Sequence, residues 1–338
     1  MLNSKKKIAS LLASLLLVST FLAACGSSES GTDSNSAPNN ASQTETEAPA
    51  AEVEESAEEP TERTVTDAMG HEVTIPANPK RVLASYLEDN LVALGVTPVA
   101  QWSVANGIQD YLQGSLQDVP TIPHDLPFEQ VASFEPDLII LDSADMASGD
   151  KYEQYSKIAP TYVIGSEQNN DWRDELLKIG EVLGKEEDAQ KAIDDYDAKA
   201  AEAKAALSEA VGDESAAAIW LVADQFYMVS EDLSSGTVMY GDLGLAVPEV
   251  VKEISATGTG NWLPISLEKL AELDTDHLFL INSDKGAGGE ALNDPLWKNI
   301  PAVKNGNVYE FGADTSWLYT GTVANTQIVD NIVNSLTK

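Results

Sequence analysis

The feature that most constrains the fold is an internal repeat. Residues 128–141 (FEQVASFEPDLIIL) align without a gap on residues 267–280 (LEKLAELDTDHLFL). Each copy predicts a short amphipathic helix, a turn at an acidic pair and an apolar strand. The two strands, Leu138–Leu141 and Leu278–Ile281, are continuous apolar runs, which is typical of parallel strands covered on both faces. The repeat therefore predicts an α/β protein of two related lobes, each with a mostly parallel sheet.

Two helices are expected between the lobes. The first spans Asp171–Leu183 and ends at Gly184, and the second, longer one spans Glu186–Val211. Apolar residues recur along the second helix at three- and four-residue steps, which indicates one buried stripe. At about 1.5 Å per residue this helix is roughly 39 Å long, so we predict a rigid connection from lobe to lobe. A surface helix within one lobe is the alternative.

The N-terminus predicts an exported protein. Lys5, Lys6 and Lys7 precede an apolar run that ends at Ala24 and is short for a membrane span. Residues 22–25 (LAAC) resemble the lipobox of bacterial lipoproteins, which implies a signal peptide over residues 1–24 and a lipid on Cys25. An uncleaved anchor helix is the alternative, and both place the folded part outside the cytoplasm.

The amino-acid composition excludes some classes of binding partner. Residues 25–62 form a Ser-, Thr-, Ala- and Glu-rich stretch without Lys or Arg, which predicts a disordered tether. The chain has 20 basic and 55 acidic residues, a formal net charge of −35, so nucleic acid is not an expected partner. Cys25 is the single cysteine, so the fold has no disulfide of its own.

Several segments resemble the iron-siderophore group of ABC-importer binding proteins. They are PKRV at residues 79–82, LGV at 94–96, FEPDLI at 134–139, LGK at 183–185 and IPAV at 300–303. The resemblance extends from about Thr64 to the C-terminus. It implies two Rossmann-like lobes joined by one long helix, with the cargo in a shallow cleft between them.

The expected organisation follows from the repeat and the resemblance together. An N-terminal lobe spans residues 63–170, an inter-lobe helical segment 171–212 and a C-terminal lobe 213–338. The resemblance also implies that one glutamate on each lobe docks onto the permease, and the matching residues are Glu129 and Glu268. The alternative is that both are first-turn acids that complement helix dipoles.

Cargo-binding residues are expected in loops after strands, where open α/β sheets bind ligands. Aromatic residues with a polar atom lie in such positions, and they can stack on a bulky ligand and form single hydrogen bonds. The residues concerned are Tyr86, Trp102, Trp317 and Tyr319. Core packing is the alternative for each of them.

Three further candidates come from other patterns. His124 and Trp262 lie just before the two repeated helices, so they should occupy similar places on opposite lobes, with Trp262 beside the Gly-rich turn 258–261. Arg173 begins a helix, where its charge gains nothing from the dipole, so a ligand oxygen or a surface acid is its expected partner. The Gly-rich loop at 285–289 is expected to be a mobile rim of the cleft.

We expect a binding lipoprotein that captures a ferric siderophore, needs no cofactor and works as a monomer on the outer face of the cytoplasmic membrane. Haem or cobalamin are alternative cargoes. An exported enzyme or an adhesive lipoprotein is disfavoured, because the sequence has only three histidines and lacks hydrolase motifs. The scarcity of histidine also disfavours bare zinc or manganese as cargo. Few arginines favour hydroxamate or citrate-hydroxamate siderophores over catecholates.

Overall fold

The computed structural model describes residues 61–105, 107–166, 171–284 and 290–337. Residues from Glu58 to the C-terminus form a compact unit of their own. The predicted signal peptide, Cys25, nearly all of the predicted tether and the Gly-rich loop at 285–289 lie outside the described residues.

The N-terminal lobe contains a parallel sheet of the order β3-β6-β7. Its strands are β3 (Val82–Leu83), β6 (Leu138–Ser143) and β7 (Thr161–Gly165). A parallel pair, β4 (Gln101–Ser103) and β5 (Thr121–Pro123), adjoins it, because the Val99 N–H donates to the Val82 carbonyl at 2.9 Å. An antiparallel hairpin precedes the sheet, formed by β1 (Arg63–Thr66) and β2 (Glu72–Ile75). The helical elements of this lobe are α1 (Glu88–Ala93), η1 (Asp110–Leu112), α2 (Gln113–Leu116), α3 (Phe128–Ser133) and α4 (Lys151–Tyr155).

The C-terminal lobe contains a five-stranded sheet of the order β10-β9-β8-β11-β12. Its strands are β8 (Ala216–Val222), β9 (Gln225–Val229), β10 (Trp262–Ile265), β11 (His277–Asn282) and β12 (Val308–Gly312). Its helical elements are η2 (Thr237–Asp242), α7 (Glu249–Ser255), α8 (Leu267–Leu270), α9 (Glu290–Asn293), η3 (Trp297–Asn299), α10 (Pro301–Asn305), η4 (Ser316–Leu318) and α11 (Thr322–Leu336).

The C-terminal sheet is more mixed than the sequence pattern predicted. Strand β11 runs parallel to β8 and β12, but β9 runs antiparallel to β8 and β10. The cause is a tight hairpin at Ala223 and Asp224, both of which have positive φ angles. The side chain of Asp284 accepts their two N–H groups at 2.6 and 2.9 Å, which holds the turn.

The two copies of the repeat occupy equivalent places. Strand β6 lies between β3 and β7, and β11 lies between β8 and β12, with parallel pairing in all four cases. Both strands are preceded by the short helices that the repeat predicts, α3 and α8. The prediction of two related α/β lobes is confirmed.

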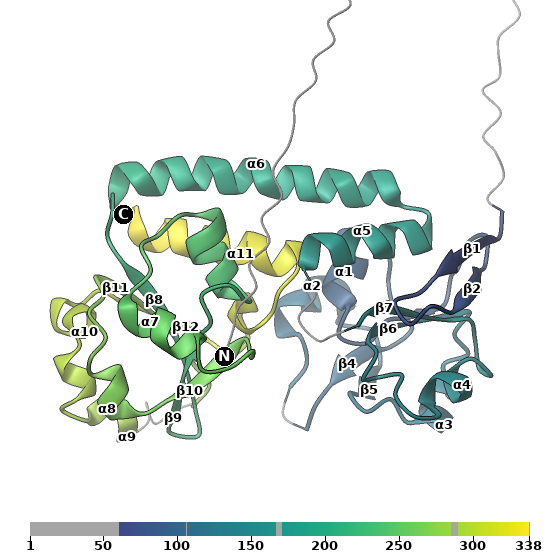
Figure 1. The fold of residues 1–338 in the computed structure, drawn as a ribbon, viewed down its shortest axis with the longest axis horizontal. Coiled ribbons are helices and arrows are strands. Elements are labelled where there is room, and N and C mark those ends of the chain that lie inside the picture. The colour runs from purple at the N-terminus through teal and green to yellow at the C-terminus, as the bar shows by residue number, and fades with distance from the viewer. Residues whose placement is uncertain (1–60, 106, 167–170, 285–289, 338) are drawn as a thin grey trace, which may run out of the picture. The chain divides into compact units, whose positions relative to one another are not determined.

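The helices between the lobes also agree with the sequence. Helix α5 spans Trp172–Leu183, with Asp171 accepting two N–H groups at its start and Gly184 in the left-handed conformation at its end. Helix α6 spans Glu186–Ala210 and contacts α5 on one side of the molecule and α11 on the other (Figure 1). Its buried residues form the predicted stripe, which comprises Ala189, Ile193, Tyr196, Ala200, Ala203 and Leu207.

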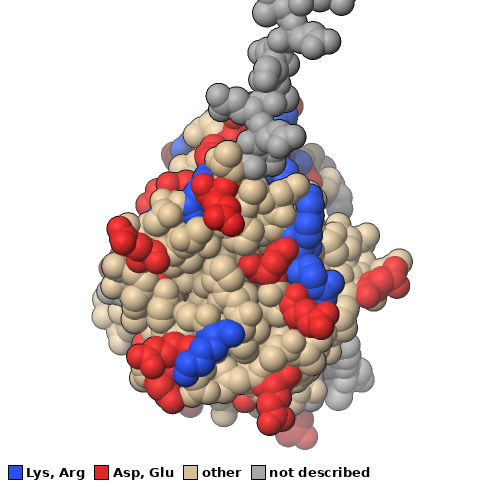
Figure 2. Space-filling view, turned by 90° about the vertical axis from the view of Figure 1, so that its right-hand side faces the viewer, with Lys and Arg blue, Asp and Glu red and all other residues tan. Residues whose placement is uncertain are grey.

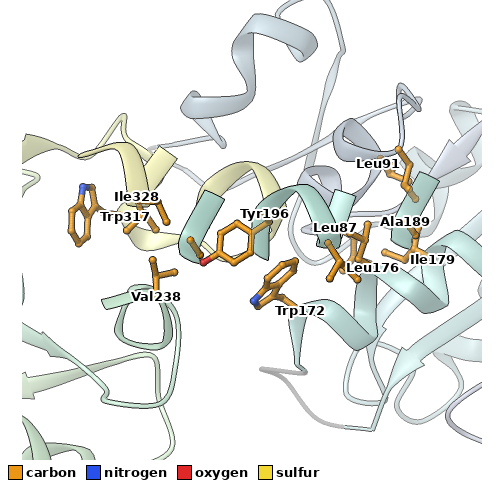
Figure 3. Close-up of a cluster of buried hydrophobic side chains, with 14 of the residues drawn as sticks. Leu87, Leu91, Trp172, Leu176, Ile179, Ala189, Tyr196, Val238, Trp317 and Ile328 are labelled. Carbon is orange, nitrogen blue, oxygen red and sulfur yellow. The ribbon is translucent and has the colours of Figure 1, made fainter. Parts of the chain in front are cut away.

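The hydrophobic core is continuous from lobe to lobe beneath α6. One cluster joins Leu138 of the N-terminal sheet, Tyr196 of α6 and Phe279 of the C-terminal sheet. Figure 3 shows part of this cluster, from Leu91 and Ile179 at one end to Trp317 and Ile328 at the other. Because α11 also contacts α1 of the N-terminal lobe, the lobes have a second connection besides α6.

Candidate functional site

A cleft of about 480 Å³ lies between the lobes. This volume is within the range of roughly 300–1,000 Å³ that is usual for small-molecule sites. Most of its lining follows the carboxyl ends of the N-terminal strands, as expected for ligand sites of open α/β sheets. Gly260, Asn261, Tyr319 and Thr320 complete it from the C-terminal lobe. The remaining lining residues are Ser85, Tyr86, Leu87, Trp102, Val104, Gln109, His124, Asp142, Met146 and Glu175.

Aromatic rings from both lobes form one wall of the cleft. The ring of Tyr86 lies 5.2 Å from that of Trp102 and 6.4 Å from that of Tyr319, centroid to centroid. Tyr111 extends the wall behind Tyr319, with their ring centroids 5.0 Å apart. The hydroxyl of Tyr319 donates to the Ile108 carbonyl at 3.3 Å, so this wall also joins the two lobes.

Tyr86 is held in an unusual position. It follows β3 with a φ of 69°, a conformation that residues other than glycine rarely adopt. Its side chain is 43% exposed, although the neighbouring residues from Val82 to Ser85 are buried. Strained backbone of this kind concentrates at ligand sites, where the surrounding structure holds it in place. The strain presents the Tyr86 ring to the cleft.

Two carboxylates line the same cleft. Asp142 lies near the end of β6, where the Ser143 hydroxyl donates to its Oδ1 at 3.0 Å. Glu175 lies in α5 and accepts a hydrogen bond from Asn90 Nδ2 at 2.7 Å. Burial raises the pKa of Asp142, although the Ser143 hydrogen bonds oppose this shift. Desolvation in the cleft, with added repulsion from Asp142, Glu88 and Glu175, raises the pKa of Tyr86 to about 12. Tyr86 therefore stays protonated at neutral pH as a hydrogen-bond donor.

The three arginines of the chain are engaged outside the cleft. Arg63 donates to the Val182 carbonyl, and Arg81 donates to the carbonyls of Phe134 and Glu135. Arg173 forms ion pairs with Asp197 and Asp242 at 2.6 and 3.3 Å. Among the described residues that line the cleft, none is Lys or Arg.

Two fully buried acids support the cleft from behind. Glu88 Oε1 accepts the backbone N–H of Trp102 at 2.6 Å, which fixes the strand that carries the Trp102 ring. Burial raises the pKa of Glu88 to about 8, so its carboxyl is largely neutral at neutral pH. The adjacent Asp89 accepts the Tyr111 hydroxyl at 3.0 Å, and burial raises its pKa to about 6.

Four of the sequence-predicted ligand residues line the cleft, namely Tyr86, Trp102, His124 and Tyr319. Trp102 lies within strand β4 rather than after a strand, because the strand begins two residues beyond Val99. The Gly-rich turn before Trp262 contributes Gly260 and Asn261 instead of the Trp262 ring itself. Contact with a ligand remains a prediction for all of these residues.

Three predicted ligand residues lie elsewhere. Trp317 is fully buried, with its ring stacked 5.0 Å from Phe279, which supports the core alternative for this residue. Trp262 begins β10, where it pairs with Val229, and its ring packs against Trp220 and is not part of the cleft lining. Arg173 forms ion pairs with the exposed Asp197 and the mostly buried Asp242, and a salt bridge to an acid is the alternative for this residue.

Other lining residues were not anticipated. Asp142 follows the apolar run of β6, so the strand-end rule could have found it. Glu175 lies inside a helical pattern, and its position carries no signal in the sequence. Tyr111, which packs behind Tyr319 without lining the cleft, lies in a short 3₁₀ turn and carries no signal either.

The proposed docking residues have equivalent positions in the two lobes. Glu129 lies in the first turn of α3 and Glu268 in the first turn of α8, and both are exposed. Figure 2 shows the end of the N-terminal lobe, where acidic and basic side chains are scattered over a largely uncharged surface. No broad basic area is visible on this face.

The described residues contain no group of three or more His, Cys, Asp or Glu side chains arranged to hold a metal ion. In the same part of the chain, no helix is both long enough and apolar enough to span a membrane.

The fold and the cleft agree with a family of known proteins. The family model described as "Periplasmic binding protein" matches residues 84–315. The chain belongs to this family of binding proteins, whose members are not enzymes.

Among its relatives, the iron(3+)-hydroxamate-binding protein FhuD of Bacillus subtilis is 30% identical over 79% of this chain and 84% of its own length. The probable siderophore-binding lipoprotein YfiY of the same species is 28% identical over 97% of both chains. A crystal structure of a periplasmic binding protein component of a ferrichrome ABC transporter from B. subtilis has a TM-score of 0.68 at 27% identity, covering 81% of this chain and all of that one. The structure of Staphylococcus aureus SirA with staphyloferrin B has a TM-score of 0.66 at 25% identity, covering 81% of this chain and 98% of that one.

Proposed function

We propose that this chain captures a ferric siderophore, with a hydroxamate type favoured, in the cleft between its lobes and delivers it to an ABC importer. The observation that carries the proposal is the aromatic wall of Tyr86, Trp102 and Tyr319. Such rings can stack on the organic shell of an iron complex while their polar atoms donate single hydrogen bonds. The names of the relatives support the same class of cargo.

The metal in this proposal is cargo, bound by the siderophore before it reaches the protein. The described residues offer no cluster of metal ligands, so recognition of the organic shell fits the site better than coordination of bare iron. No resident cofactor is required by this role.

A fluorescence titration tests the proposal. Trp102 lines the cleft, so a bound ferric complex should quench part of the tryptophan emission of the chain from Gly26 onward. The panel comprises ferric hydroxamates, ferric citrate-type siderophores, ferric catecholates, haem and cobalamin. We expect saturable quenching by a ferric siderophore. In the Trp102→Phe variant, the part of the quenching that comes from the Trp102 ring should disappear. Binding of haem or cobalamin alone would reject the siderophore proposal in favour of those cargoes.

The proposed partner on the membrane is the permease of an ABC importer, driven by its ATPase. Glu129 and Glu268 are exposed in equivalent first turns on the two lobes. Two carboxylates related by the repeat suit a two-fold permease, since each lobe can contact one half of it. The protein itself is proposed to act as a monomer.

The proposed location is the outer face of the cytoplasmic membrane, through a lipid on Cys25. The support for this location is the sequence pattern around Cys25 and the relative named as a lipoprotein. Replacing Cys25 by Ser in the full chain should move the protein from the membrane fraction to the medium. A Cys25→Ser protein that stays in the membrane fraction would contradict the anchor.

A further inference from the structure

Two adjacent acids lie behind the aromatic wall of the cleft, at the beginning of α1. Glu88 and Asp89 are only 0% and 2% exposed. Burying a carboxyl group is costly, and the cost is offset only where hydrogen bonds hold the group. The hydrogen-bond partners of these two acids therefore indicate what the pair holds in place.

Glu88 is hydrogen-bonded to the backbone of both residues that supply a ring to the wall from the N-terminal lobe. Its Oε1 accepts the N–H of Trp102 at 2.6 Å. Burial raises the pKa of this carboxyl, and backbone hydrogen bonds from Trp102, from Glu88 itself and from Tyr86 oppose the shift. One side chain thus holds two separate backbone segments in fixed relative positions.

Tyr86 depends on such restraints because its backbone is strained. Its φ is 69°, and the turn around it is closed by the N–H of Leu87, which donates to the Ala84 carbonyl at 3.1 Å. A residue other than glycine keeps this conformation only where the surrounding structure enforces it. The hydrogen bond to the Glu88 carboxyl adds a second restraint on the turn.

Asp89 holds the part of the wall that comes from the C-terminal lobe. Its Oδ2 accepts the Tyr111 hydroxyl at 3.0 Å, and the Tyr111 ring lies 5.0 Å from that of Tyr319. Its two oxygens also accept the N–H groups of Val323 and Ala324, in the first turn of the helix that follows Tyr319. Asp89 thus restrains Tyr319 both through the ring behind it and through the backbone after it.

We propose that Glu88 and Asp89 are a pair of positioning residues for ligand capture. Glu88 sets the rings of Tyr86 and Trp102, and Asp89 sets the ring of Tyr319 against them from the opposite lobe. Neither acid is among the described residues that line the cleft, so both act through the rings and not by contact with the ligand. This inference rests on the proposed function and specifies which buried residues its affinity depends on.

Fluorine NMR tests the position of the Trp102 ring without a ligand. The chain from Gly26 onward is labelled with 5-fluorotryptophan, and the variants Trp102→Phe and Trp297→Phe assign two of its lines. Glu88→Ala should shift or broaden the Trp102 line. The Trp297 line should stay in place, because Trp297 packs on Phe226 in a separate core cluster of the C-terminal lobe. Glu88→Gln should leave both lines in place, because its amide oxygen can still accept the Trp102 N–H. An unchanged Trp102 line in Glu88→Ala would overturn the role of Glu88.

Affinity measurements test whether the two acids act through the rings. The probes are ferrichrome and ferrioxamine B, two ferric trihydroxamates. Glu88→Ala and Asp89→Ala should each weaken binding about tenfold, within the range for the loss of one central aromatic contact. In a Trp102→Ala background the effect of Glu88→Ala should fall to about threefold or less, because residues that act through one another are not additive. The effect of Asp89→Ala should fall in the same way in a Tyr319→Ala background. Fully additive losses would overturn the inference.

A matched variant separates positioning from loss of stability. Leu278→Ala removes a fully buried side chain from the separate core cluster of the C-terminal lobe, which contributes no residue to the described cleft lining. It should lower the melting temperature and leave the affinity for both probes unchanged, at a temperature where all variants are folded. A loss of affinity with Leu278→Ala as large as that with Glu88→Ala would show that affinity follows stability, and it would overturn the inference. If the wild type binds neither probe, the hydroxamate form of the proposed function is rejected, and the Trp102 line alone decides whether Glu88 positions that ring.

Discussion

Asp89 in α1 caps the first turn of α11 in the opposite lobe, with its Oδ2 accepting the backbone N–H of Ala324 at 2.8 Å. Its Oδ1 accepts the N–H of Val323 at 2.9 Å. Gly321 precedes this turn with a φ of 134°, and a Cβ there would lie 2.3 Å from Asp89 Oδ1. A carboxylate from one lobe thus satisfies the helix end of the other, so the lobes are joined by a polar contact as well as by α6.

Replacing Asp89 by Ala should lower the free energy of unfolding by about 2–4 kcal/mol, because two helix N–H groups and the Tyr111 hydroxyl would lose their acceptor in a buried place. Urea denaturation followed by circular dichroism measures this change. The exposed Asp118 is the control, and its change to Ala should have an effect within about 0.5 kcal/mol. An equally small effect at Asp89 would show that this cap does not hold the lobes together.

The stability of the protein should fall as the pH rises from about 5 to about 8. Burial raises the pKa of Glu88 from 4.5 to about 8, so the folded chain keeps this proton where the unfolded chain loses it. The neutral Glu88 carboxyl contributes its full stabilisation when the pH is below the pKa of the unfolded state. This stabilisation is lost as the pH rises through the pKa of the folded state. Asp89 adds the same trend over a lower range, since its pKa is raised from 3.8 to about 6.

Glu88→Gln should flatten this pH dependence, because the amide oxygen can still accept the Trp102 N–H but the side chain no longer titrates. Urea unfolding at about pH 5, 6.5 and 8 compares the variant with the wild type. Glu153→Gln, at an exposed site, should leave the slope unchanged. Parallel slopes for the wild type and Glu88→Gln would contradict the assignment.

Trp102→Ala should weaken siderophore affinity by about 1–3 kcal/mol, the usual loss for a central aromatic contact. Calorimetric titration of the variant against the best ligand of the panel measures this loss. Trp262→Ala is the matched control, because the Trp262 ring packs on Trp220 and is not part of the cleft lining. A greater loss of affinity at Trp262 than at Trp102 would reverse the assignment of the two rings.

Trp317→Ala should act on stability rather than on recognition. The ring is fully buried against Phe279 and Phe311, and its removal leaves a cavity that should cost about 3–5 kcal/mol. Thermal unfolding with and without ligand separates the two effects. If the Trp317→Ala variant had wild-type stability but bound the ligand more weakly, Trp317 would be assigned to the ligand site.

Glu129→Ala combined with Glu268→Ala should abolish siderophore uptake by cells while leaving the affinity for the ligand unchanged. Both side chains are exposed and neither lines the cleft, so their loss should not alter the ligand site. Uptake of a radioactive iron complex, measured beside titration of the purified variant, tests this. Normal uptake would reject the docking role and leave the helix-dipole explanation.

Much of the architecture could be predicted from the sequence, because it depends on local patterns. The repeat predicts that β6 and β11 are equivalent parallel strands, and each pairs in parallel with a strand on either side. The apolar stripe and the glycine after α5 predict two consecutive helices with nearly the bounds observed. Such features follow from the periodicity of apolar residues within a single segment. This periodicity is present in the sequence and does not depend on tertiary contacts.

The composition of the site was decided by the tertiary structure. Trp317 and Tyr319 lie two residues apart after the same strand, yet one ring is buried in the core and the other faces the cleft. Arg173 and Glu175 lie in the same helix, yet only the glutamate lines the cleft. The sequence by itself determined the repeat, the strands and the connecting helices. Packing between residues far apart in the chain decided which side chains of each element face the other lobe. No local sequence pattern predicts that orientation.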